Sequence, residues 1–208
     1  MKHPLVRRPF IALVVALSAL AGCSSAPQRE AQWIDPAIGT QSRLLKGETV
    51  LIACDAYDVA VLRICQDQLY REVLAKGAKP VTVPAGTVLL KDRELDGQLV
   101  ASAQALGARA VLTMTLTPAT SSGGSGVSLG IGGFSFGGSG GAGVGLGIPI
   151  GVGNPTTGFA ANGRVTDVRT NRMVWTATLV AAPSADLNAQ FGNLSRSMLD
   201  TAQSAGLF

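Results

Sequence analysis

Residues 92–117 read DRELDGQLVASAQALGARAVLTMTLT, and they contain a helical pattern followed by a strand pattern. Its apolar residues first recur along one helix face: Leu95, Leu99, Ala103 and Leu106. This spacing predicts a helix over residues 92–106, which Gly107 would end. Residues 110–117 then alternate and are rich in β-branched side chains, which predicts a strand. A helix that feeds directly into a strand indicates a domain whose helices and strands share one core.

Apolar periodicity and turn signals divide the rest of the chain into further elements. They predict strand 49–54, helix 56–76, short β-type runs at 81–83 and 87–90, a hairpin of strands 159–168 and 173–181, and helix 187–202. Together these elements predict an α+β fold, a mixed β-sheet packed by about three helices. The domain is expected to cover residues 47–206, interrupted by a glycine-rich β-hairpin or loop insertion at residues 121–153.

Residues 1–22 have the pattern of a secretory signal peptide: basic residues, an apolar run, then small residues. The apolar run is short for a transmembrane helix. The sequence LAGC at residues 20–23 resembles the lipobox of bacterial lipoproteins. This resemblance implies cleavage before Cys23, acylation of its thiol and its new amino group with palmitate-type chains, and, because Ser24 follows, passage to the outer membrane. An ordinary cleaved signal beside a chance cysteine is the alternative.

Removal of the signal peptide changes the charge and the available chemistry. With Lys2, Arg7 and Arg8 gone, 14 of the 17 basic residues remain against 13 acidic residues, a net charge of +1. This near-neutral balance gives no electrostatic case for nucleic-acid binding. His3, the only histidine, is removed as well, which excludes most histidine-dependent catalysis and metal binding. We therefore expect no catalytic residues, no cofactor and no metal ion.

Residues 23–46 are polar and contain Pro27 and Pro36, a composition typical of a tether between a membrane and a domain. Trp33 and Ile34 form an apolar pair within this segment that could dock onto the domain. The folded domain is expected to begin after the tether.

Cys54 and Cys65 are the even pair that remains once Cys23 is acylated, in a compartment where disulfides persist. Cys54 would end the predicted strand, and Cys65 would face inward two turns into the predicted helix. A disulfide requires Cα atoms within about 7 Å, and a strand and a helix are often farther apart. A disulfide and two buried free thiols both remain open, whereas the spacing rules out a C-x-x-C redox motif.

The insertion at 121–153 contains 15 glycines, yet its apolar residues follow a pattern. They alternate with small residues in two arms: Val127, Leu129, Ile131, Phe134 and Phe136, then Val144, Leu146, Ile148, Ile150 and Val152. One interpretation is a hairpin that enters the outer membrane within an oligomer, since each arm matches a transmembrane strand in length. A surface loop or hairpin is another, favoured by Pro149 and by the absence of Tyr and Trp. A third is an edge that binds partner strands.

Other motif matches have structural interpretations. Matches to G-x-G-x-x-G and G-x-S-x-G within the glycine-rich tract lack, respectively, a strand-to-helix context and a histidine base. Asp92, Glu94 and Asp96 imitate the start of a calcium loop, but its twelfth position is Ala103, so a solvated turn leading into a helix is expected. A charged set is expected to form an exposed hairpin face or a partner-binding patch: Arg164, Asp167, Arg169 and Arg172.

Two segments carry a family resemblance: ALGARAVL at residues 105–112, and the hairpin with VTDV at 165–168 and MVW at 173–175. They resemble a broad group of proteobacterial lipoproteins whose domain is similar to the N-terminal domain of TolB. The group includes the curli secretion channel lipoprotein and lipoprotein activators of peptidoglycan synthases. Uncharacterised lipoproteins with a glycine-rich stretch before such a hairpin are a closer likeness. The resemblance spans roughly residues 48–205 and implies the fold, with no catalytic or cofactor residues to carry over.

These observations predict a lipid-anchored outer-membrane lipoprotein on the periplasmic side. It would act as a non-enzymatic binding or scaffold module of the cell envelope. Its partners would be the membrane and either an unknown envelope protein or further copies of itself. The alternative is an oligomeric secretion or pore subunit that inserts its glycine-rich hairpin into the outer membrane. An enzyme that uses serine, tyrosine or carboxylates alone has little support, because no two carboxylates pair convincingly in the sequence.

Overall fold

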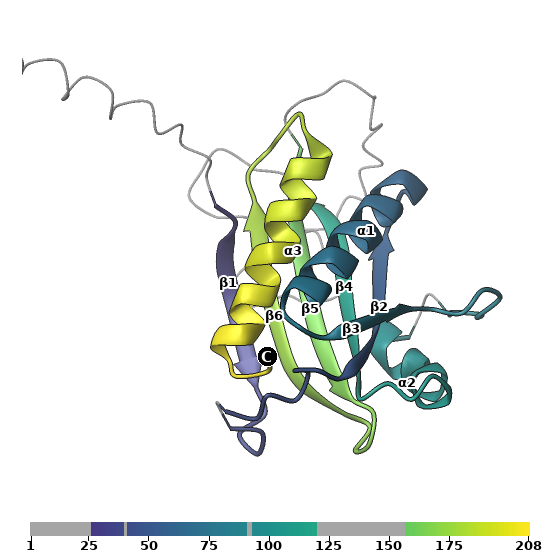
Figure 1. The fold of residues 1–208 in the computed structure, drawn as a ribbon. Helices are drawn as coiled ribbons and strands as arrows, with labels where there is room; N and C mark the ends of the chain where they lie inside the picture. The colour runs from purple at the N-terminus through teal and green to yellow at the C-terminus, as the bar shows by residue number, and fades with distance from the viewer. Residues whose placement is uncertain (1–25, 40, 91–92, 120–156) are drawn as a thin grey trace, which may run out of the picture.

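The computed structural model describes residues 26–39, 41–90, 93–119 and 157–208. They form a six-stranded sheet in the order β1-β6-β5-β4-β2-β3, with three helices (Figure 1). The strands are β1 (Gln28–Ile34), β2 (Thr49–Ala56), β3 (Lys79–Thr82), β4 (Ala110–Ala119), β5 (Gly158–Asp167) and β6 (Arg172–Ala181). The helices are α1 (Val59–Ala75), α2 (Leu95–Ala105) and α3 (Leu187–Ser204).

The sheet is mixed. Strand β2 runs parallel to both β3 and β4, whereas β5 is antiparallel to β4 and β6, and β1 is antiparallel to β6. The crossovers between parallel strands pass through α1 and α2, as parallel pairing requires. The structure confirms the predicted α+β fold with a mixed sheet and three helices, while the glycine-rich insertion lies outside the described residues.

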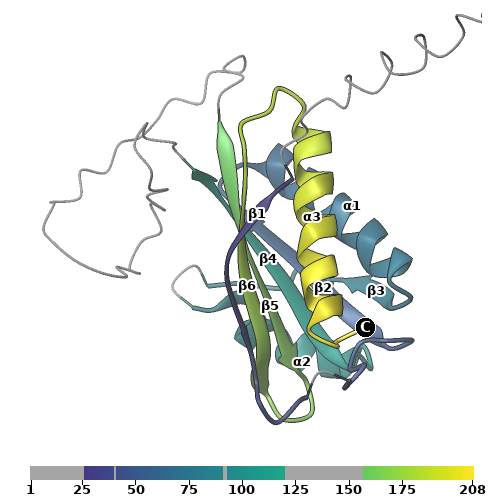
Figure 2. The ribbon, with the colours of Figure 1, turned by 90° about the vertical axis from the view of Figure 1, so that its left-hand side faces the viewer.

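The helices cover the two faces of the sheet unequally. Helices α1 and α3 pack together on one face (Figure 2), over a large apolar core that includes Trp175, Phe159 and Phe191. Helix α2 packs on the other face against β2, β4 and β5, over a smaller core. Among the described helices, none combines the length and the apolar character needed to cross a bilayer.

Helix α1 shows why the four-residue period predicted the helices well. Its buried residues form one stripe: Val61, Cys65, Leu69 and Val73. The Asp58 carboxylate accepts hydrogen bonds from the N–H groups of Ala60 and Val61, which caps the first turn. The helix ends before Gly77, whose φ of 82° is the left-handed conformation that glycine adopts without strain.

The start of the domain differs from the prediction of a tether over residues 23–46. Residues Gln28–Ile34 form the edge strand β1, which pairs with β6, and Leu44 and Leu45 are buried in the main core. The residues of β1 do not alternate between buried and exposed, because six of the seven are exposed. The strand is held by backbone hydrogen bonds to β6, and the pattern of its side chains does not reveal this pairing.

The structure also differs from the short β-type runs predicted at 81–83 and 87–90. Strand β3 covers Lys79–Thr82, and residues 87–90 form no strand. Instead, Gln98 of α2 binds this segment: its Oε1 accepts from Leu90 N–H at 2.6 Å, and its Nε2 donates to the Leu90 carbonyl at 2.9 Å. The β-branched content of this segment thus does not lead to sheet pairing.

Close packing of α3 on the sheet depends on Gly163 of β5. A Cβ at this position would lie 2.5 Å from Sδ of Met198 and 3.0 Å from its Cγ. Met198 is fully buried in the main core, so its side chain has little room to retreat. Glycine is therefore required here to let α3 approach β5.

A Gly163→Ala variant is expected to lose about 1–3 kcal/mol of unfolding free energy, because it overpacks the contact with Met198. Urea unfolding followed by circular dichroism measures the change. Gly97→Ala is the matched control, since nothing lies within 4 Å of a Cβ there. This variant should gain about 0.5–1 kcal/mol of unfolding free energy, because alanine is a better helix former than glycine. Equal stability of the Gly163→Ala variant and the parent would contradict the packing argument.

Candidate functional site

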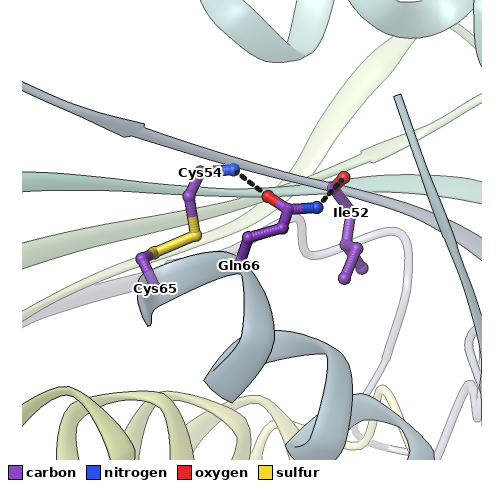
Figure 3. The surroundings of a disulfide bond; sticks show 4 residues. All are labelled: Ile52, Cys54, Cys65 and Gln66. Atoms are coloured by element: carbon purple, nitrogen blue, oxygen red, sulfur yellow. Dashed lines mark hydrogen bonds between the residues drawn. A yellow bond between two sulfur atoms is a disulfide. The ribbon is translucent and has the colours of Figure 1, made fainter. Parts of the chain in front are cut away.

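A disulfide bond joins Cys54 of β2 to Cys65 of α1 (Figure 3). Their Cα atoms are 6.1 Å apart, within the range that a disulfide spans. Of the two arrangements that the sequence leaves open, the structure contains the bond rather than two free thiols. Both residues are buried, so the bond is shielded from reductants in solution.

Gln66 lies beside the disulfide and binds the backbone of β2 (Figure 3). Its Oε1 accepts from the Cys54 N–H at 3.0 Å, and its Nε2 donates to the Ile52 carbonyl at 3.2 Å. The ladder between β2 and β3 ends where Ile52 faces Thr82. The Gln66 amide therefore supplies the donor and the acceptor that a longer β3 would have supplied.

The other predicted contact residues lie outside the described residues. They are the lipidation candidate Cys23 and the ten apolar residues of the insertion: Val127, Leu129, Ile131, Phe134, Phe136, Val144, Leu146, Ile148, Ile150 and Val152. The Cys23 and insertion interpretations therefore stay predictions.

The acidic start of α2 is bonded to β5. Arg164 forms an ion pair with Glu94, and its Nε lies 3.4 Å from Oδ1 of Asp96. Thr166 donates its hydroxyl hydrogen to Oδ2 of Asp96 at 2.5 Å. Glu94 is exposed, as the predicted solvated turn requires, but Asp96 is only 3% exposed because α2 packs against β5 at this point. Asp96 thus holds α2 to the sheet.

Asp167 at the end of β5 is held by hydrogen bonds from several donors. Burial by itself would raise the pKa of this carboxyl group. Hydrogen bonds from Arg109 and from the backbone N–H groups of Arg169 and Thr170 outweigh burial, so the pKa of Asp167 lies below its ordinary value. The ionised carboxylate therefore stabilises the junction between α2, β4 and the β5–β6 turn.

The charged set around the hairpin does not gather into one patch. Arg164 is engaged by the start of α2 and Asp167 by Arg109. Arg172 extends in a third direction, where its Nη2 lies 3.1 Å from Oδ2 of Asp35, just after β1. These three residues connect elements of the fold, so they form neither the exposed charged face nor the partner-binding patch that the sequence left open.

A polar surface lies on the sheet face opposite α1 and α3, beyond the edge of α2. We call it the open face and define it by the half-buried or exposed residues Trp33, Thr115, Thr117, Asn162, Thr176 and Thr178. The strand register places them in rows, since Thr115 faces Asn162, Asn162 faces Thr178, and Trp33 faces Thr176. Asn162 Nδ2 donates to Thr178 Oγ1 at 3.0 Å.

The open face can hydrogen-bond to a ligand laid across it. Its hydroxyl and amide groups are both donors and acceptors, and the exposed indole of Trp33 adds apolar area at one side. No cluster of three or more metal-ligating side chains occurs in the part of the chain that the structure describes. The arrangement suits recognition of a polar surface or chain by contact.

Sequence reasoning missed the open face because it depends on register across four strands. The threonines of β4 and β6 were visible as alternating residues of strands, but their alignment with Asn162 needed the pairing of both neighbours. Of the apolar pair expected to dock, Ile34 packs against the main core, whereas Trp33 is exposed on the edge strand.

Reduction of the disulfide is expected to lower the unfolding free energy by about 3 kcal/mol, because cysteines separated by 11 positions close a short loop in the unfolded chain. Urea unfolding with and without dithiothreitol measures this. In the Cys54→Ala/Cys65→Ala control, the reductant should have no effect. Identical midpoints for the parent in both conditions would show that the bond does not stabilise the domain.

Asp167→Asn is expected to cost about 2 kcal/mol at neutral pH, since it removes charge-assisted hydrogen bonds. Because the folded pKa is lowered, the stabilisation is complete above the ordinary Asp pKa of about 4 and is lost as the pH falls through the folded value. The variant should therefore show a shallower loss of stability in acid. Asp200→Asn, which alters a more exposed ion pair with Lys76, is the control and should change little.

No protein-family model matches the chain, and no curated protein matches it. Two solved structures of PelC from Paraburkholderia phytofirmans, both described as dodecamers and one a single-residue variant, are similar to it at 14% sequence identity. The first covers 87% of this chain and 97% of PelC with a TM-score of 0.43. The variant covers 87% and 98% with a TM-score of 0.44. Similarity at this level carries no argument about what this chain does.

Proposed function

We propose that this protein is a lipid-anchored, non-enzymatic module that binds or scaffolds a component of the cell envelope on the periplasmic side of the outer membrane. The Cys54–Cys65 disulfide is the observation that carries the proposal. Structural disulfides persist in the periplasm and other oxidising compartments and are rare in the cytosol. The bond therefore supports the export that the LAGC sequence at residues 20–23 predicts.

The fate of the charged side chains supports a binding role over an enzymatic one. Asp96 and Arg164 are occupied in bonds that join α2 to β5, and Asp167 is bonded to Arg109 just before β4. The open face, in contrast, presents neutral hydroxyl and amide groups from three neighbouring strands. Groups of this kind recognise a partner by hydrogen bonds but supply neither a strong base nor a nucleophile activated by one.

A Cys23→Ala variant is expected to lose incorporation of radiolabelled palmitate and to leave the membrane fraction, because each buried CH₂ of an acyl chain adds about 0.8 kcal/mol to membrane binding. Labelling in cells, followed by fractionation of the envelope, measures both properties. The Cys54→Ala/Cys65→Ala variant is the matched control and should retain the label. A parent protein that takes up no palmitate would contradict the proposal.

The alternative is an oligomeric secretion or pore subunit, and the size of the detergent-extracted protein distinguishes the two. If gel filtration and electron microscopy show monomers and no rings, the binding or scaffold role is supported. Rings with a central opening would replace it with the pore.

A further inference from the structure

The strand registers bring several chain segments to one end of the sheet. Gln28 at the start of β1 faces Val180 near the end of β6, and Ala181 faces Phe159 near the start of β5. The carboxyl end of β2 and the first turns of α1 and α3 lie at this same end, at the top of Figure 1, whereas the C-terminus lies at the bottom. We call this the Gln28 end of the sheet.

The Gln28 end is also the end nearest to Cys23 along the chain. Only four residues separate Cys23 from Gln28. Even a fully extended chain of this length spans no more than about 18 Å. An acylated Cys23 would therefore hold the start of β1 within this distance of the lipid headgroups.

Two exposed apolar side chains lie at the Gln28 end, directly after β2. Tyr57 is 50% exposed and Val59 is 66% exposed. The Tyr57 ring stacks on Phe159, with ring centroids 6.5 Å apart, so its position is fixed against the main core. Burial, and to a smaller extent the neighbouring Asp58 carboxylate, raises the pKa of Tyr57, so the phenol is neutral at physiological pH. A tyrosine with an apolar ring and a polar tip suits a membrane interface.

The charges around these residues favour one type of lipid surface. Asp55, Asp58 and Asp186 are exposed near the carboxyl end of β2 and at the starts of α1 and α3, and they outnumber the exposed cations Arg29 and Arg63 at the starts of β1 and α1. Carboxylates are repelled by a surface of anionic lipids, whereas a zwitterionic surface carries no net charge to repel them.

From this geometry we infer that the Gln28 end of the sheet lies against a zwitterionic bilayer surface, with Tyr57 and Val59 at the level of the headgroups. The inference rests on the proposed lipid anchor, which it deepens by fixing the orientation of the domain. The strands then run roughly perpendicular to the membrane plane, so the open face points sideways and the loops around the C-terminus point away from the bilayer.

Fluorescence quenching in bilayers tests this orientation. A Trp33→Phe background removes the exposed native indole and leaves only the buried Trp175. Tyr57→Trp then places an indole at the Gln28 end, and Val88→Trp places a matched control in the segment after β3, which leaves the sheet sideways in Figure 1. The lipidated mature proteins are reconstituted into phosphatidylcholine and phosphatidylethanolamine vesicles with brominated acyl chains.

We expect the brominated lipids to quench the indole of the Tyr57→Trp protein and to leave the indole of the Val88→Trp protein unquenched. Trp175 contributes the same background fluorescence to both proteins. Addition of phosphatidylglycerol should weaken the quenching, because of the three aspartates. Thermal unfolding of both variants checks that they fold.

Two other outcomes separate the orientation from the anchor. If both proteins float with the vesicles but the Tyr57→Trp indole is unquenched, or if anionic lipid strengthens its quenching, the orientation is wrong while the lipid anchor stands. If neither protein floats and neither incorporates palmitate, the anchor fails and the orientation fails with it.

Discussion

Strand β2 has an unpaired edge, and the bonds that cover this edge fix the position of α1. Because β3 is only four residues long, half of β2 has no neighbouring strand on that side. The disulfide and the Gln66 amide attach α1 to this edge, one covalently and one by replacing the missing ladder bonds. Helix α1 in turn supports α3, and these two helices form the large core with the sheet.

On the opposite face of the sheet, polar side chains attach α2 to the strands. Asp96 and Arg164 attach α2 to β5, and Asp167 attaches the end of β5 to Arg109. Asp96 is buried, accepts a hydrogen bond from Thr166 and lies beside Arg164, so moving α2 away from β5 would leave a buried carboxylate unpaired. The same residue types would suggest a site if they were judged from sequence alone. Their partners show that they hold the fold together.

Much of the fold was predictable because its helices are amphipathic. The four-residue period placed α1, α2 and α3 within a few residues of their observed ends, and alternation placed β4, β5 and β6. Strand β1 was not predicted, because six of its seven residues are exposed and give no alternating pattern. The disulfide depended on one Cα separation, and the open face on alignment between strands. Neither the Cα separation nor the alignment of the strands can be predicted from the local pattern of residues.

The two margins of the sheet have features that discourage further strands from adding to them. On one side, β3 is short and contains Pro80, which has no N–H to donate. On the other, β1 carries a bulge between Arg29 and Ala31, with charges at Arg29 and Glu30. Neighbouring copies of the domain would thus be hindered from joining edge to edge into a continuous sheet, which favours contacts through side chains over contacts through backbone amides.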